Sequence, residues 1–248
     1  VLQAATPDGK PIATLVNFAV HPEVLGNEVG IVSPDLVGPF ADRLEAAAGG
    51  MALFVNGAQG GMITADNRVL DKPSNPVRGV WHDSRTWDEC LRIGNLMADE
   101  ALRIIKDAPR QTDPLLFCAC EDVKLPVDSD LLWGVIQHSP LKYPVHSDRT
   151  VTTRVNLVNI GDTQILTIPG EALPNIGFYL KRKMRGKHQM LFGLTNEAFG
   201  YILTQVDFQS FPRYDYVSRT SLGEMTGEIL LRHWLGLIER SPEPNAGD

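Results

Sequence analysis

The hydrophobic pattern of the chain alternates between short apolar runs and amphipathic stretches. Residues 12–20, "IATLVNFAV", carry almost no polar group, which predicts a strand buried on both faces. Residues 33–50 carry helix signals, with Ser33 as the N-cap and Gly49–Gly50 as the end. A second apolar run, 51–57, completes a strand–helix–strand unit, and its long crossover predicts a parallel strand pair.

Later segments predict further helices and strands. Helices are predicted over 86–108, 173–186 and 221–239, and strands over 152–171 and 189–195. Thr86 and Glu89 form a capping box, and the apolar face of that helix is predicted from Leu91, Met97, Leu102 and Ile105. Turn chemistry at Gly161–Asp162 predicts a hairpin. The sum predicts an α/β fold, a mixed-sheet layered sandwich with helices on its outer faces.

Composition is that of an ordinary globular protein. The 248 residues are 43% hydrophobic and 21% charged, with a formal net charge of −7. We expect no nucleic-acid partner, because basic residues cluster only at 181–187, which we interpret as a solvated helix end. No apolar run approaches the roughly 20 residues that span a bilayer, so no transmembrane segment is expected. One domain is expected over 1–240, followed by a disordered tail over 241–248.

Three cysteines are too few for a disulfide framework. Cys118 and Cys120 would point to one face of a strand, and Cys90 would lie on a helix. A CxC motif without a second pair is a weak metal signature, so we expect all three cysteines to pack in the core.

Polar residues stand at the exits of several predicted strands. Because Pro22 has no N–H and a fixed φ, it cannot extend a ladder, and it holds His21 where open α/β sheets bind ligands. Glu171 and Tyr201 stand at two further exits, and the glycines of 55–66, "VNGAQGGMITAD", let backbone N–H groups approach an anion. Imidazole, carboxylate and phenolate all suit a cation such as zinc. Each also has an ordinary structural interpretation: a buried histidine, a helix-capping acid and a half-buried aromatic.

Five motifs, in order and spacing, resemble the neutral/alkaline (non-lysosomal) ceramidase family. They are "NFAVHP" at 17–22, "VSPDLVGPFADRLE" at 32–45, "FVNGAQGGMITADN" at 54–67, "IPGE" at 168–171 and "GYILTQVDFQSFPRYDY" at 200–216. The resemblance covers about residues 10–235. It implies a zinc-dependent amidase that cleaves N-acylsphingosine into fatty acid and sphingosine, acting on a small-molecule or lipid-like amide in an extracytoplasmic, secreted or periplasmic, setting.

Carried over residue by residue, the resemblance implies zinc ligands at His21, Glu171 and Tyr201, with Tyr214 near the site. A further ligand histidine of the family belongs to a segment upstream of these motifs. The resemblance therefore implies that the ceramidase-like catalytic domain over 1–240 lacks its N-terminal part, and that an N-terminal segment of the same precursor supplies that histidine.

Thr64 occupies the position of the family's serine in "GDVSPN". Met62 and Ala65 replace the aspartate and the proline, and threonine adds a methyl group that crowds the site. This departure leaves open a hydrolase of another amide or ester, and Thr64 is equally well interpreted as a turn residue that bonds its own loop. An alternative from a different functional class is that the chain is a non-catalytic binding module with an incomplete metal site.

The chemistry of such a site is that of metal-assisted hydrolysis. Zinc with an open position lowers the pKa of bound water to about 7 and polarises the scissile carbonyl. Thr64 would then orient the substrate or stabilise the oxyanion, and Tyr214 would donate to the developing charge. Further expectations place Asn56 and Gln59 in the lining of the site, His82 as a substitute ligand, and Asp35 in the first turn of its helix rather than on the metal.

Overall fold

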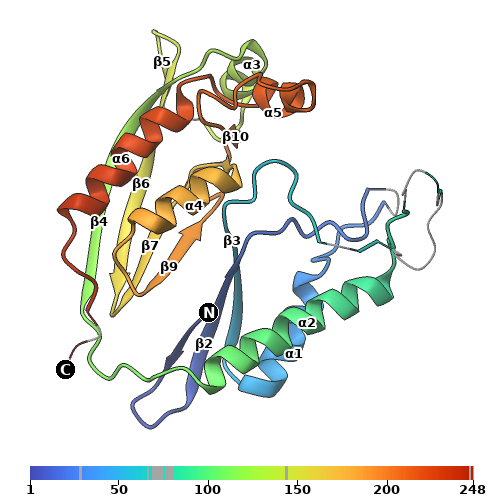
Figure 1. Ribbon diagram of the computed structural model, residues 1–248, viewed down its shortest axis with the longest axis vertical. Helices are drawn as coiled ribbons and strands as arrows, with labels where there is room; N and C mark the ends of the chain where they lie inside the picture. The colour runs from blue at the N-terminus through green and yellow to red at the C-terminus, as the bar shows by residue number, and fades with distance from the viewer. Residues whose placement is uncertain are drawn as a thin grey trace. The chain divides into compact units, whose positions relative to one another are not determined.

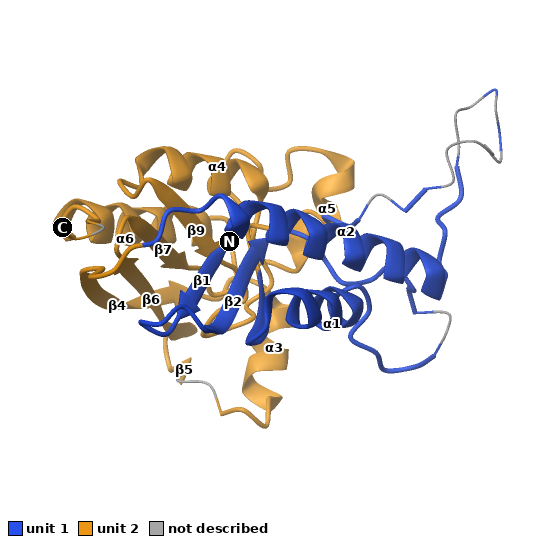
Figure 2. Cartoon of the chain, turned by 90° about the horizontal axis from the view of Figure 1, so that it is seen from below, with its two compact units in different colours: residues 1–55, 63–110 blue, residues 56–62, 111–248 orange. Residues whose placement is uncertain are grey.

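The structure is a computed structural model that describes residues 1–27, 30–65, 67–68, 75, 77, 81–142, 145–245 and 247. The chain divides into two compact units (Figure 2). Unit 1 holds residues 1–55 and 63–110, and unit 2 holds residues 56–62 and 111–248. The single domain over 1–240 stays a prediction. Asp66, in the quoted glycine-rich motif, lies outside the described residues.

Unit 1 is a three-stranded sheet with two helices. Its elements are β1 (Leu2–Ala5), β2 (Pro11–Phe18), α1 (Val37–Ala48), β3 (Met51–Asn56) and α2 (Trp87–Lys106), with the strands in the order β1-β2-β3 (Figure 1). Val16 of β2 packs with Phe40 and Leu44 of α1 and with Ala98 and Ala101 of α2. The prediction of a strand buried on both faces is wrong for β2: the fully buried residues, Thr14 and Val16, share one face, and the opposite face is only partly buried.

Both predicted helices of unit 1 form, with one start displaced. Helix α1 begins at Val37 rather than at Ser33, because Asp35 has a φ of +50° that no helix accommodates. Ser33 Oγ accepts the backbone N–H of Asp35 at 3.1 Å instead of capping the helix. In α2 the Thr86 half of the predicted capping box is confirmed, since the Thr86 side chain accepts the backbone N–H of Glu89 at 3.2 Å, whereas the Glu89 carboxylate accepts from Arg92.

The predicted apolar face of α2 is confirmed for Met97 and Leu102, which pack against buried clusters, and is wrong for Leu91. The buried residues of α2 are Cys90, Gly94, Ala98 and Ala101, whereas Leu91 is exposed. A Cβ at Gly94 would crowd backbone atoms of Leu36 and Phe40 at the start of α1. Small residues therefore occupy the buried face of α2, because they let the backbones of α1 and α2 approach closely.

Unit 2 contains a five-stranded mixed sheet. The strands are β4 (Leu116–Pro126), β5 (Val145–His146), β6 (Thr150–Ile160), β7 (Thr163–Thr167) and β9 (His188–Phe192), in the order β4-β6-β7-β9 with β5 paired to β6. Strands β7 and β9 are parallel and the other pairs are antiparallel, which confirms a mixed sheet. The predicted hairpin is confirmed: β6 and β7 pair in antiparallel fashion around a turn at Gly161–Asp162.

Helices cover one face of that sheet, which confirms the α/β class. The remaining elements are α3 (Asp130–His138), β8 (Glu171–Ala172), α4 (Pro174–Lys183), β10 (Tyr201–Ile202), η1 (Pro212–Tyr214), α5 (Asp215–Arg219) and α6 (Thr226–Arg240). Helices α4 and α6 lie along the sheet in Figure 1. Trp234 of α6 is fully buried, and its indole N–H donates to the Thr167 carbonyl at 3.0 Å. No helix among the described residues is long and apolar enough to span a bilayer.

Strand β4 corrects the expectation for two cysteines. Phe117 and Ala119 pack against the main hydrophobic core, so Cys118 and Cys120 project from the opposite face and are exposed. Cys90 in α2 is buried, as expected. All three cysteines are free thiols.

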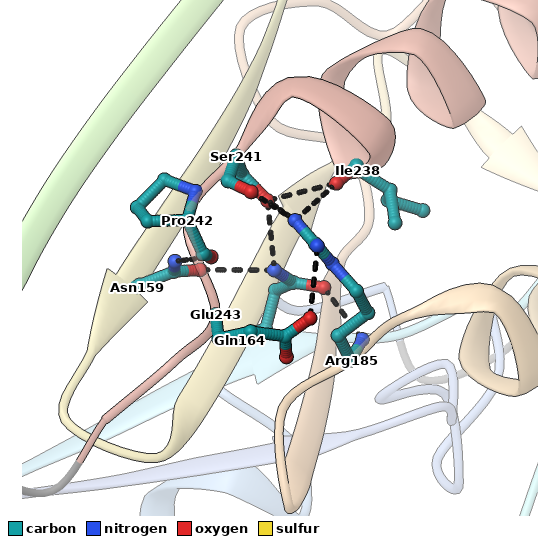
Figure 3. A network of polar contacts seen from close by, with 7 residues as sticks. All are labelled: Asn159, Gln164, Arg185, Ile238, Ser241, Pro242 and Glu243. Atoms are coloured by element: carbon teal, nitrogen blue, oxygen red, sulfur yellow. Dashed lines mark hydrogen bonds and ion pairs between the residues drawn. The ribbon is translucent and has the colours of Figure 1, made fainter.

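Arg185, within the basic cluster 181–187, has a structural role that the sequence did not suggest. Its guanidinium donates to the Ile238 carbonyl at 2.7 Å and to the carbonyl and hydroxyl of Ser241 (Figure 3). An ion pair of 2.9 Å joins it to Glu243. The interpretation of the cluster as a solvated helix end is therefore wrong for Arg185, which binds the C-terminal end of α6.

The segment after α6 makes contacts along its first residues. Ser241 is buried, and the Pro242 carbonyl accepts the side-chain N–H of Asn159 at 3.1 Å (Figure 3). The disordered tail over 241–248 stays a prediction, and these contacts run counter to it at its start; residues 246 and 248 lie outside the described ones.

Candidate functional site

The two candidate residues of unit 1 are neighbours. His21 and Thr64 form an isolated β-bridge beyond the ends of β2 and β3. The bridge is parallel, which is the orientation predicted for the strand–helix–strand unit. The backbone N–H of His21 donates to the Ile63 carbonyl at 3.0 Å. Since paired strands lie about 4.8 Å apart, the bridge holds the imidazole and the threonine hydroxyl on adjacent stretches of backbone.

The ring of His21 has a defined tautomer. Its Nδ1 lies 2.6 Å from the Ile63 carbonyl oxygen. Because a carbonyl oxygen only accepts hydrogen bonds, Nδ1 carries a proton, and in the neutral ring the lone pair is then on Nε2. Histidines that bind metals commonly donate their second ring N–H to a backbone carbonyl in this way.

A buried carboxylate holds the segment that follows His21. Asp35 accepts the backbone N–H groups of Val24 at 3.0 Å, of Leu25 at 2.9 Å and of Leu36 at 2.7 Å. The expectation that Asp35 is a first-turn helix acid is therefore wrong. Asp35 lies ahead of the helix and ties this segment to the start of α1. Burial, followed by the Asp35 carboxylate, raises the pKa of the Cys90 thiol to about 12.

The two candidate metal ligands of unit 2 are register partners. Strands β8 and β10 are parallel, with Tyr201 opposite Glu171 and Ile202 opposite Ala172. The backbone N–H of Glu171 donates to the Gly200 carbonyl at 2.8 Å. Because residues opposite each other in paired strands project to the same face, the carboxylate and the phenol leave the sheet side by side. Tyr201 is buried and Glu171 is partly buried.

Aromatic rings surround Tyr201. The Tyr216 ring meets it edge to face, with centroids 5.9 Å apart. Tyr214 packs against the cluster formed by Leu173, Tyr201, Leu203 and Val217. Its ring meets that of Phe211 edge to face, with centroids 5.6 Å apart. Three candidate residues of unit 2, at positions 171, 201 and 214, thus gather around β8 and β10.

The glycine-rich loop 57–61 packs against β8. The backbone N–H of Gly60 donates to the Ala172 carbonyl at 2.8 Å, so this group serves the fold rather than an anion. A Cβ at Gly60 would overlap the Glu171 carbonyl oxygen, which explains the glycine. Gln59, beside it, is 1% exposed.

A cavity adjoins the tyrosine cluster within unit 2. Its volume is about 580 Å³, which lies in the range typical of small-molecule sites. The lining includes Phe208, Tyr216, Ser218, Arg219 and Thr220. The Thr220 carbonyl accepts the backbone N–H of Tyr201 at 3.1 Å, so the cavity wall is bonded to β10.

Burial raises the pKa of the Glu197 carboxyl in the loop that leads to β10.

The candidate residues thus form two groups, His21 with Thr64 in unit 1 and the remaining three in unit 2. Within the described part of the chain, no three His, Cys, Asp or Glu side chains gather as a metal-binding group. His82 is exposed. The sequence reasoning missed the role of Asp35, although an aspartate ahead of an apolar helix start is a signal for backbone capping.

Comparisons with known proteins identify the fold. No family model matches the chain, and no curated protein matches it in sequence. The neutral ceramidase from Pseudomonas aeruginosa matches in structure with a TM-score of 0.69 and 15% sequence identity, over 98% of this chain and 46% of that one. A ceramidase complexed with C2 matches with a TM-score of 0.67 and 15% identity, over 98% and 48%. The chain therefore has the fold of the neutral ceramidases and spans about half the length of those enzymes.

Proposed function

We propose that this chain is the metal-binding part of a zinc-dependent hydrolase that cleaves the amide bond of an N-acylsphingosine or a related N-acyl substrate. The observation that carries the proposal is the register pairing of Glu171 with Tyr201, which puts two oxygen donors on one face of a two-stranded sheet. The neutral ceramidase fold over 98% of the chain supports it.

The donor set suits zinc. Nε2 of His21 carries the lone pair, and Glu171 and Tyr201 offer a carboxylate and a phenol, the nitrogen and oxygen donors that zinc accepts. We propose that an upstream segment of the precursor supplies a further histidine. Zinc, when bound, supplies Lewis-acid polarisation of the carbonyl and an activated water.

The residues of this chain have separate tasks in that reaction. The Ile63 carbonyl holds the proton on Nδ1 of His21, which keeps the lone pair on Nε2. Thr64, paired with His21, donates from its hydroxyl to the carbonyl oxygen of the substrate as negative charge develops there. Tyr214 donates its phenolic O–H to the same charge, and the aromatic cluster around Tyr201 excludes water.

Thr64 supports a second candidate, a hydrolase of another amide or ester on the same fold. Its branched side chain stands where the resembled family carries a serine, and the added methyl group takes space from the substrate. A non-catalytic binding module is the alternative from another class. An extracytoplasmic location is part of the proposal and rests on the family resemblance.

The test measures zinc by elemental analysis and hydrolysis of a fluorogenic N-acyl amide, with the chain in its full-length protein. We expect about one zinc per chain and activity, and we expect His21→Ala and Glu171→Gln each to lose both. His138→Ala and Glu239→Gln, at exposed positions, are the matched controls and keep both. Unchanged zinc content and activity in either ligand variant would overturn the proposal, and absence of zinc in the wild type would favour the binding module.

A further inference from the structure

Gln59 is a buried side chain whose amide has no partner. It is 1% exposed, and neither Nε2 nor Oε1 makes a hydrogen bond within the described part of the chain. Burial of an amide without hydrogen bonds is costly, and such groups are rare in native proteins. An amide that retains both unmet positions, on a loop beside a candidate ligand, points to a ligand that meets them.

The loop holds Gln59 firmly in unit 2. On one side, the backbone N–H of Gly60 donates to the Ala172 carbonyl at 2.8 Å, on the strand that carries Glu171. On the other, the Asn56 carbonyl accepts the backbone N–H of Gly193 at 2.8 Å, just after β9. The side chain therefore projects from backbone that is bonded at both ends, which suits a group that recognises a ligand.

We infer that Gln59 recognises the amide group of the substrate. Oε1 accepts the N–H of the scissile amide, and Nε2 donates to an oxygen acceptor of the same molecule. An ester has no N–H, and its bridging oxygen would face Oε1, so two acceptors would oppose each other. Gln59 thus selects amides over esters. This inference rests on the proposed amide hydrolysis and deepens it.

The test compares a matched pair of fluorogenic substrates, an octanoyl amide and an octanoyl ester, on wild type and Gln59→Met. Methionine keeps the length of the side chain and removes both polar atoms. We expect kcat/KM for the amide to fall about tenfold, as for a lost hydrogen bond that leaves its partner unmet. The ester value stays or rises, because the opposed acceptor is gone, so the amide-to-ester ratio falls.

Stability gives a second readout that does not depend on activity. Because Gln59→Met removes an unpaired buried amide, we expect Tm to rise by a few degrees. Thr153→Val is the matched control, since Thr153 is 3% exposed and its hydroxyl also lacks a partner. We expect it to raise Tm in the same direction and to leave the amide-to-ester ratio unchanged. Gln59→Leu serves if the methionine variant does not fold.

Binding of the uncleaved amide by calorimetry separates this inference from the proposed function. Cleavage of the amide with an unchanged ratio in Gln59→Met keeps the proposed function and overturns the inference. If the amide binds in a way that depends on Gln59 but is not cleaved, the inference is kept and the proposed function is overturned. A lower Tm with equal losses on amide and ester makes Gln59 a structural residue and overturns the inference. If the wild type neither binds nor cleaves the amide, the proposed function and this inference are both overturned.

Discussion

The two groups of candidate residues are supported by different forces. His21 and Thr64 meet in a single isolated bridge, and the segment after His21 is held by the buried carboxylate of Asp35. Glu171 and Tyr201 are paired by strands, and Tyr201 lies in an apolar cluster. The segment after His21 thus depends on the bonds of a buried carboxylate as well as on the packing of Val24 and Leu25, whereas the unit 2 pair depends on strand pairing and on its apolar cluster. Single polar substitutions should therefore affect unit 1, and core substitutions should affect unit 2.

Trp234→Ala should have the largest effect. Its indole is fully buried in the unit 2 core and donates to the Thr167 carbonyl, so we expect the free energy of unfolding to fall by about 4 kcal/mol. Urea denaturation of purified protein measures this. Trp234→Phe keeps most of the volume and loses only the hydrogen bond, so its cost should be smaller. Equal costs for both variants would show that packing is not the main support of unit 2.

Asp35→Ala should come next, with its effect in unit 1. Three buried backbone N–H groups lose a charged acceptor, and we expect a loss of about 3 kcal/mol in the free energy of unfolding. Hydrogen exchange should show faster opening at Val24 and Leu25. Asp42→Ala, at an exposed position of α1, is the control and should change stability by less than about 0.5 kcal/mol. Equal effects of the two variants would contradict a polar support for this segment.

Arg185→Met tests the polar exception within unit 2. Loss of the guanidinium leaves the Ser241 carbonyl without its donor and removes one of the two donors to the Ile238 carbonyl, which keeps the Ser241 hydroxyl, so we expect a loss of about 2 kcal/mol. Glu243→Gln is the control, because the side chain of Glu243 is 70% exposed and a solvated ion pair contributes less than about 1 kcal/mol. Denaturation curves of the two variants decide this. A Glu243→Gln cost as large as that of Arg185→Met would assign the stability to the ion pair instead.

Several regular elements could be predicted from the sequence because local signals define them, whereas β1 and α3 were not predicted. The Thr86 cap and the Gly161–Asp162 hairpin are examples of such signals. The start of α1 could not, because the left-handed backbone of Asp35 depends on its bonds to Val24 and Leu25, ten or more residues away. Leu91 was placed on the wrong face of α2 because close approach of the two helices selects small residues there.

The candidate site was predictable as residues and not as an arrangement. Motifs pointed to Glu171 and Tyr201 separately, but their pairing joins two strands of two residues each, too short to leave a periodic pattern. Gln59 was expected in the lining of the site, but the absence of a partner for its buried amide has no sequence signature. Contacts between residues far apart in the chain decide both features.

The smallest expected effect concerns thiol labelling, which reports the two units separately. Cys118 and Cys120 of unit 2 are exposed and should react with a maleimide at pH 7.5 within minutes. Cys90 of unit 1 should remain unlabelled in the native protein, because it is buried and its pKa of about 12 keeps the thiol protonated. In Asp35→Ala, Cys90 should label faster, since the segment packed against it opens more often, and mass spectrometry of labelled peptides measures the rate. Asp42→Ala should leave that rate unchanged. Labelling of Cys90 in the wild type at the rate of Cys118 would mean that unit 1 opens readily without any substitution, and the Asp35 carboxylate would then not be what holds the His21 segment in place.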